Sequence, residues 1–207
     1  MLAELVVAAI RWGSVGPLVL ASAGIMGSPG PATVSLVTVV AAYGVRRSLP
    51  YLCGLIVGSA LVLVAVATGV TATLLAVPAL RSLLIAVAVA YILWLAYHIA
   101  SAPPLPGQSA AADAPSLAGG TVLGVANPKG WVAMAAVFAS ARLGDTALTD
   151  AAAKTAVLVV MIVLIMTAWL IAGASLAPML REPRRARIIN AALAAALVAA
   201  TAVAVLH

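Results

Sequence analysis

Two proline-containing stretches hold the groups of this sequence best suited to binding an anion. The first, SPGP, covers residues 28–31 and lies within an uncharged stretch, 12–45. A proline inside a helix removes one backbone hydrogen bond and clashes with the carbonyl four residues earlier, and Gly30 between two prolines adds to the unwinding. A new helix is expected to begin at Pro31, with its free N–H groups and positive dipole end facing the apolar interior. Such a helix end can bind a carboxylate.

The second stretch, Asn127-Pro128-Lys129, has the same design and adds a charge. Asn127 is a good N-cap and Pro128 a good first helical residue. Lys129 is the one basic residue far from the end of an apolar run, and an ionisable side chain at that depth is a functional candidate. We expect its partner to be an anionic ligand or the carbonyls freed at the first break. The alternative is that Lys129 extends to an interface and Pro128 only kinks the helix.

The predicted ligand-binding residues come from these two stretches and from Thr33, whose hydroxyl group follows the first stretch. These are Ser28, Pro29, Gly30, Pro31, Thr33, Asn127, Pro128 and Lys129. Ser35 and Thr38 could also line a path for a ligand. The alternative for these hydroxyl groups is a hydrogen bond within their own helix.

Acidic residues fall at the ends of the apolar runs or between them: Glu4, Asp113, Asp145, Asp150 and Glu182. A path for a cationic side chain or a divalent metal ion would need an acid within the membrane. The sequence also has no His-rich metal cluster, no GxSxG and no phosphate-binding glycine loop. We therefore expect no catalytic residue, no metal site and no cofactor.

Composition places the chain in a lipid bilayer. Of its 207 residues 65% are hydrophobic and only 8% are charged, whereas a soluble domain carries about a quarter charged residues. The chain cannot cover a globule with polar surface, so lipid must be part of its solvent, and the fold class is an all-α integral membrane protein. The net charge of +6 comes from basic residues between apolar runs, which suits cytoplasmic loops and anionic lipid better than nucleic acid.

The apolar runs are long enough for about six transmembrane helices, since a span needs about 20 apolar residues. The expected spans are 12–45, 49–70, 82–101, 117–141, 155–177 and 188–206. Residues 102–116 form a linker between a first three-helix repeat, 1–101, and a second, 117–207, and proline breaks the first helix of each. Because three is odd, the second repeat would enter from the opposite side, the inverted repeat common in transporters. Chance similarity of apolar helices is the alternative.

Further features bear on topology and association. Residues 12–45 would measure about 50 Å as one helix, more than the bilayer core. A re-entrant hairpin there would leave five spans and move the N-terminus to the other side. With six spans, the distribution of basic residues favours both termini outside the cytoplasm. The GLIVG stretch, 54–58, favours close helix packing within one chain over dimerisation, and homo-oligomer formation stays open.

At the two breaks the sequence resembles the lysine-exporter (LysE/RhtB) family of amino-acid exporters. The resemblance rests on residues 28–58, 89–99 and 124–134, and its order and spacing hold along nearly the whole chain. The positions that match the family's motifs are Pro29, Gly30, Pro31, Asn127, Pro128 and Lys129. A longer N-terminal segment and a proline-rich linker depart from the family pattern.

The resemblance implies a multi-pass protein of the bacterial cytoplasmic (inner) membrane whose substrate is an amino acid. We expect a secondary transporter, not an enzyme, that exports a small amino acid by alternating access, with the proton gradient as its energy source. The lack of an intramembrane acid favours a neutral over a basic amino acid. Two alternatives stay open: an exporter of a metal ion or another small solute within the same superfamily, and a membrane scaffold or assembly protein that transports nothing.

Overall fold

The computed structural model describes residues 11–69, 77–101, 115–176 and 183–206, and within these ranges its elements are helices, as predicted. In chain order they are η1 (Trp12–Ser14), α2 (Val15–Ile25), α3 (Pro31–Tyr43), α4 (Val45–Ala67), α6 (Pro78–Ala100), α7 (Leu117–Ala126), α8 (Pro128–Ala139), α9 (Ala147–Leu176) and α10 (Pro183–Leu206). Residues 1–10 with Glu4, most of the predicted linker 102–116 with Asp113, and residues 177–182 with Glu182 lie outside the described residues.

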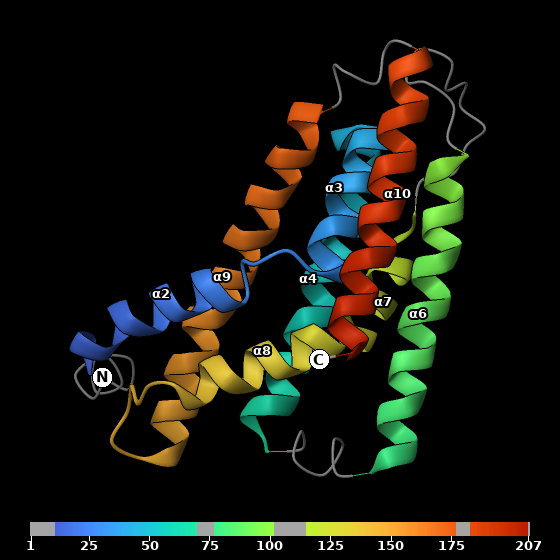
Figure 1. The fold of residues 1–207 in the computed structure, drawn as a ribbon. Coiled ribbons are helices and arrows are strands. Elements are labelled where there is room, and N and C mark those ends of the chain that lie inside the picture. Colours follow the sequence, from blue (N-terminus) through green and yellow to red (C-terminus); the bar gives the residue numbers. More distant parts are fainter. Residues whose placement is uncertain (1–10, 70–76, 102–114, 177–182, 207) are drawn as a thin grey trace.

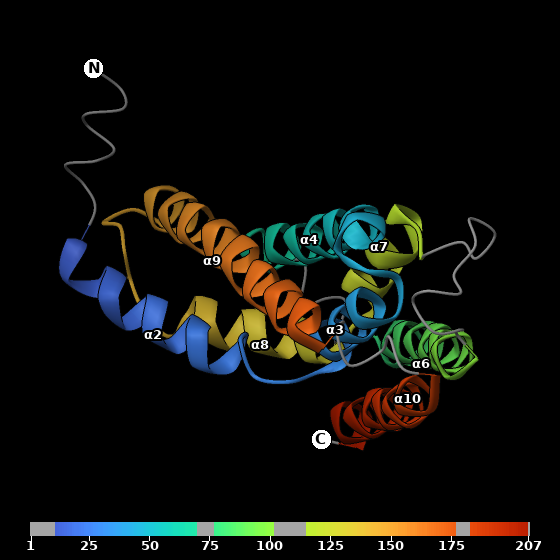
Figure 2. The same ribbon diagram turned by 90° about the horizontal axis from the view of Figure 1, so that it is seen from above.

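Some helices run along one another and others lie across them. Figure 1 shows α3, α4, α6 and α10 along the long direction of the molecule, with α2 and α8 lying across it. Turned by 90°, Figure 2 shows α6 and α10 nearly end-on but α2 and α8 from the side. The most extensive packing is between α4 and α7, α6 and α10, and α3 and α9. The transverse helices α2 and α8 contact each other, and α2 also contacts α9.

Both predicted helix breaks are present. α2 ends at Ile25 and α3 begins at Pro31, with Gly30 extended before it (φ −168°, ψ 178°). α7 ends at Ala126 and α8 begins at Pro128, and the two helices are bent by 61° relative to each other. Proline suits the first position of α3 and α8 because the N–H that it lacks would have no partner there.

By length and composition, α4 and α9 can each cross a bilayer, and α7 with α8 would make a third crossing as a broken span. These counts refer to the described part of the chain alone. The structure thus has the apolar helices of a membrane protein. Six spans, their orientation and the inverted repeat of 1–101 and 117–207 stay predictions.

Glycines bring α4 and α7 into backbone contact. A Cβ added to Gly58 would lie 2.9 Å from the Cα of Gly124, and one added to Gly120 would lie 3.1 Å from the Cα of Gly54. A larger side chain at this crossing would force the two backbones apart. The prediction that Gly54 and Gly58 serve packing within one chain is confirmed, and their partners are the equally spaced Gly120 and Gly124.

Gly58→Leu should separate α4 from α7 and lower the free energy of unfolding by about 1–3 kcal/mol, the usual range for overpacking. Gly16→Ala is the matched control, because a Cβ at Gly16 of α2 meets nothing within 4 Å. The melting temperature of the purified protein in detergent measures both effects. If Gly58→Leu had the same melting temperature as wild type, the crossing of α4 and α7 would accommodate a larger side chain, which would contradict this packing.

α9 begins at Ala147, before the predicted start at Thr155, because polar side chains of the preceding connection cap its first turn. The N–H of Thr149 lies 3.2 Å from Thr146 Oγ1, and the N–H of Thr146 lies 3.1 Å from Thr149 Oγ1, each donating to the other residue's hydroxyl. This reciprocal arrangement satisfies backbone donors that a helix start leaves unpaired. The polar sequence that suggests a loop is therefore part of the helix.

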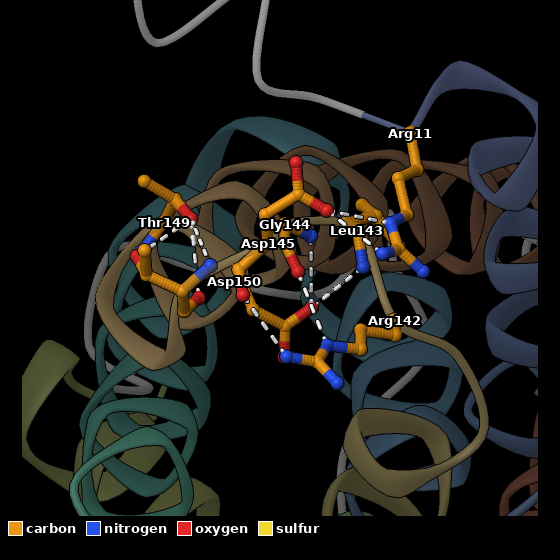
Figure 3. Close-up of polar contacts among 8 residues, drawn as sticks. Arg11, Arg142, Leu143, Gly144, Asp145, Thr149 and Asp150 are labelled. Atoms are coloured by element: carbon orange, nitrogen blue, oxygen red, sulfur yellow. Dashed lines mark hydrogen bonds and ion pairs between the residues drawn. The ribbon is translucent and has the colours of Figure 1, made fainter.

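Asp150 fixes the connection between α8 and α9 (Figure 3). Its Oδ1 accepts hydrogen bonds from two backbone N–H groups of the connection, at 2.5 and 3.2 Å. Its Oδ2 lies 2.8 Å from Lys154 Nζ, and the two side chains are only 17% and 7% exposed. A second ion pair, exposed, joins Arg11 ahead of α2 to Asp145 at 2.8 Å. The connection is thus held both to α9 and to the start of α2.

Candidate ligand-binding site between the helix breaks

A cavity lies between the two helix breaks. Its empty volume is about 450 Å³, counting the part open to the outside. Both breaks and the helices α3, α4, α8 and α9 contribute to it. It is lined by Met26, Ser28, Gly30, Ala32, Thr33, Ser59, Asn127, Lys129, Gly130, Ala133, Met134, Ile162, Ile165 and Met166. Residues from both predicted repeats thus surround one cavity.

Lys129 joins the second break to the first. Its ammonium donates hydrogen bonds to the carbonyl oxygens of Ser28 and Pro29, the latter at 2.9 Å, and to Ser28 Oγ at 2.7 Å. An ammonium has three N–H donors, so all of them are in use. The carbonyls lie just beyond the C-terminal end of α2, which is the negative end of its dipole. In the structure Lys129 therefore binds the carbonyls freed at the first break, which are one of the two partners predicted for it.

Side chains satisfy several more backbone groups at the breaks. Trp169 Nε1 on α9 donates to the Gly27 carbonyl at 3.2 Å, and Trp131 Nε1 on α8 donates to a carbonyl of α7 at 2.7 Å. Thr33 Oγ1 accepts from the N–H of Gly30 at 2.9 Å and donates to its carbonyl at 3.1 Å. An unsatisfied backbone group in lipid costs several kcal/mol. These bonds therefore stabilise broken helices in apolar surroundings.

Asn127 lies at the break between α7 and α8 and is 8% exposed. An N-cap asparagine normally accepts a hydrogen bond from the first turn of its own helix, but the Asn127 side chain makes no capping bond. Its Oδ1 is buried and has no hydrogen-bond partner among the described residues. The polar end of the cavity therefore has a buried acceptor that the described part of the chain leaves unused.

The rest of the cavity wall is apolar and adaptable. Its larger side chains are Met26, Met134, Ile162, Ile165 and Met166, and methionine fills irregular gaps because it is unbranched and flexible. No acidic residue is among the described residues that line the cavity, and the same part of the chain holds no group of His, Cys, Asp or Glu that could bind a metal ion. The cavity suits a small solute with an anionic group and an apolar part.

The predicted binding residues that line the cavity are Ser28, Gly30, Thr33, Asn127 and Lys129. Pro29 contributes its carbonyl oxygen to Lys129, while Pro31 and Pro128 begin α3 and α8 without lining the cavity. Ser35 and Thr38 donate to carbonyls of their own helix at 2.8 and 2.6 Å. This hydrogen bonding within the helix is the alternative to lining a path for a ligand. Ligand binding by the predicted residues stays a prediction.

Ser59 and the α9 residues at the cavity were not predicted from the sequence. Ser59 directly follows Gly58, so the glycine spacing was the one signal that it lies at a helix crossing. The sequence of α9 beyond Lys154 is apolar on most sides. It therefore gives no sign of which face meets the cavity.

Comparison with known proteins gives one match. A family model described as LysE type translocator matches residues 23–207, a range that begins just before the first break and includes the second. Neither a curated protein nor a solved structure matches the chain. The family match covers most of the sequence, and the apolar helices agree with it. The chain therefore belongs to the family of LysE type translocators.

Proposed function

We propose that this translocator exports small neutral amino acids across the cytoplasmic membrane of a bacterium by alternating access. Its family makes it a carrier of amino acids or related solutes. The observation that carries the proposal is the position of Lys129, the one cation among the described residues that line the cavity. An anionic group that enters the cavity meets this ammonium without an acid beside it to compete.

A carboxylate would replace the carbonyls of Ser28 and Pro29 as the partner of Lys129. A charged acceptor forms a stronger hydrogen bond with an ammonium than a neutral carbonyl does. The first turn of α3, which begins at Pro31, adds N–H groups without intrahelical partners and the positive end of the helix dipole. Substrate binding would thus loosen the link between the two breaks and allow the repeats to move relative to each other.

The cavity wall favours a neutral side chain. Methionine and isoleucine side chains offer an apolar surface on which an aliphatic or thioether group gains free energy by leaving water. A basic side chain would bring a second positive charge toward Lys129, and no acid lines the described cavity to compensate it. Lysine and arginine should therefore be poor substrates.

Part of the helix packing supports alternating access by two related halves. If the two predicted repeats, 1–101 and 117–207, were exchanged, α8 would take the place of α3 and α9 the place of α4. The contact between α3 and α9 would then become a contact between α8 and α4. Both contacts exist. The contacts of α4 with α9 and of α6 with α10 would map onto themselves, and both also exist. Such pairing fits repeats that rock about a central site.

Efflux from cells tests the proposal. The chain would be expressed in a bacterium that lacks its own amino-acid exporters, the cells loaded with dipeptides, and the amino acids in the medium measured. We expect one or a few neutral amino acids to leave faster than from cells with an empty vector, and lysine and arginine not to. Identical media despite full membrane expression would contradict amino-acid export, and transport of a metal ion or another solute, or a scaffold role, would take its place.

Gly30→Ala should lower export about tenfold without a large loss of stability. A Cβ at Gly30 would lie 2.6 Å from Lys129 Cδ and 3.1 Å from its Nζ, so the flexible lysine must move by more than a few tenths of an ångström. Misplacement of a binding group by about 1 Å can cost as much as a hundredfold in rate. Gly24→Ala, where a Cβ meets nothing within 4 Å, is the control. Equal efflux rates of the two variants would contradict the position given to Lys129.

A further inference from the structure

The polar side chains at the cavity divide into those that are already hydrogen-bonded and those that are not. Ser28 Oγ donates to the Ile25 carbonyl at 2.8 Å and accepts from Lys129. Thr33 Oγ1 both accepts from and donates to Gly30. Lys129 has its three donors in use. The Lys129 donors and both hydroxyl hydrogens are therefore in use, while each hydroxyl oxygen keeps one lone pair.

Asn127 and Ser59 are different. Asn127 Oδ1 is buried without a partner in the described part of the chain. Ser59 is 6% exposed, and no hydrogen bond of its hydroxyl occurs among the described residues. A buried serine in a helix usually bonds back to a carbonyl of its own helix, as Ser48 of the same helix does with Gly44 at 2.8 Å. A buried acceptor without a donor is costly, so Asn127 Oδ1 points to a ligand that brings a donor, and Ser59 lines the same cavity.

The glycine crossing brings these two residues to the same region. Ser59 follows Gly58, and a Cβ on Gly58 would lie 3.0 Å from the backbone N of Val125, two residues before Asn127. Both side chains line the cavity that also holds Lys129. Ser59 of α4, Asn127 ahead of α8 and Lys129 in its first turn therefore line one cavity.

We propose that Asn127 Oδ1 and the Ser59 hydroxyl form a subsite for the protonated amino group of the substrate. This inference rests on the proposed function and adds that the cavity recognises the ammonium as well as the carboxylate. An ammonium brings N–H donors, and an amide oxygen and a hydroxyl oxygen can both accept them. The substrate brings its own counter-charge, the carboxylate beside its ammonium, so the two neutral acceptors need only to satisfy N–H donors of the ammonium.

Counterflow into liposomes that contain the purified protein tests the subsite. The competitors are the best-exported amino acid, the same skeleton without its amino group, and the same skeleton without its carboxylate. For leucine these are L-leucine, 4-methylpentanoate and 3-methylbutylamine. For each competitor, the concentration that halves counterflow is measured. The amino-group ratio is this concentration for the compound without the amino group divided by that for the amino acid. The carboxylate ratio is the concentration for the compound without the carboxylate divided by that for the amino acid. Wild type should prefer the amino acid over the des-amino acid by at least about tenfold.

Variants of the two residues should change the amino-group ratio alone. Asn127→Ala is expected to reduce it about tenfold and Ser59→Ala about threefold, with the carboxylate ratio retained. Asn127→Asp keeps an acceptor and should keep a preference for the amino group, so it serves where the alanine variant fails to fold. Lys129→Met should reduce the carboxylate ratio instead. Ser48→Ala is the matched control on α4, because the Ser48 hydroxyl bonds only within its own helix, and it should change neither ratio.

The outcomes separate the inference from the proposed function. If wild type transports the amino acid but accepts the des-amino acid equally well, the subsite is wrong and amino-acid export stands. An unchanged amino-group ratio in Asn127→Ala and Ser59→Ala overturns the subsite as well. If wild type transports no amino acid, the proposed function is wrong, and the subsite falls with it.

Discussion

Lys129→Met should lower export at least about thirtyfold while the protein still folds and inserts. Methionine has a similar length but neither charge nor N–H, so the substrate carboxylate loses its ionic partner, and removing one member of a buried charge pair costs about 2–5 kcal/mol. Lys129→Arg keeps the charge, but its planar guanidinium has less room beside Gly30 than an ammonium, so partial export is expected. Initial efflux rates, divided by the amount of protein in the membrane, give both values.

Arg46→Met is the matched control for the loss of charge. Arg46 is exposed near the start of α4 and does not line the cavity, so its replacement removes one positive charge and should leave export unchanged. A monodisperse protein with a near-normal melting temperature shows that Lys129→Met is folded. Full export by that variant would contradict carboxylate binding by Lys129.

Asp150→Asn should cause the largest loss of stability, about 3–5 kcal/mol, because it leaves a buried ammonium without its counter-charge. The Lys154 side chain is 7% exposed and lies 2.8 Å from Asp150 Oδ2, with the Phe138 ring 4.9 Å from its Nζ. An asparagine oxygen can still accept the two backbone N–H groups that Asp150 binds, so the change isolates the loss of charge. Thermal unfolding of the purified protein in detergent measures it.

Two further variants show whether the buried pair is responsible. Asp145→Asn breaks the pair with Arg11, whose side chains are 53% and 66% exposed, and such an exposed pair contributes only about 0–1 kcal/mol. Lys154→Met added to Asp150→Asn removes the unpaired charge and should recover much of the loss. Equal melting temperatures for Asp150→Asn and Asp145→Asn, or no recovery in the double variant, would contradict the role given to the buried pair.

The helix breaks could be predicted from the sequence because proline acts locally. Pro31 and Pro128 lack the backbone N–H and have a fixed φ, so they favour the first helical position whatever surrounds them. The contact of Lys129 with the carbonyls of the first break could be predicted only as one of two alternatives, the other being an anionic ligand. The choice between a ligand and the carbonyls depends on how close two breaks about a hundred residues apart come in the fold, and local sequence contains no such distance.

The start of α9 and the part of the cavity wall that α4 and α9 contribute could not be predicted for a related reason. The residues ahead of α9 are polar and suggest a loop, yet Thr146 and Thr149 use their hydroxyl groups to cap a helix. Ser59, Ile162 and Met166 reach the cavity because α4 and α9 pack beside the breaks. Their helices are apolar on most sides, so periodicity does not distinguish a face that meets a cavity from one that meets lipid.

The most direct test of the account is the distance between Lys129 and a bound amino acid. The chain has only two lysines, Lys129 and Lys154, so ¹⁵N-lysine labelling gives two Nζ signals, and Lys129→Arg assigns them. Solid-state NMR in lipid, with the exported amino acid labelled with ¹³C at its carboxylate, would measure dipolar coupling to each signal. We predict coupling that corresponds to about 4 Å or less at Lys129, the range of an ion pair, and none at Lys154. Saturating substrate without coupling at Lys129 would contradict the central claim that this lysine binds the carboxylate.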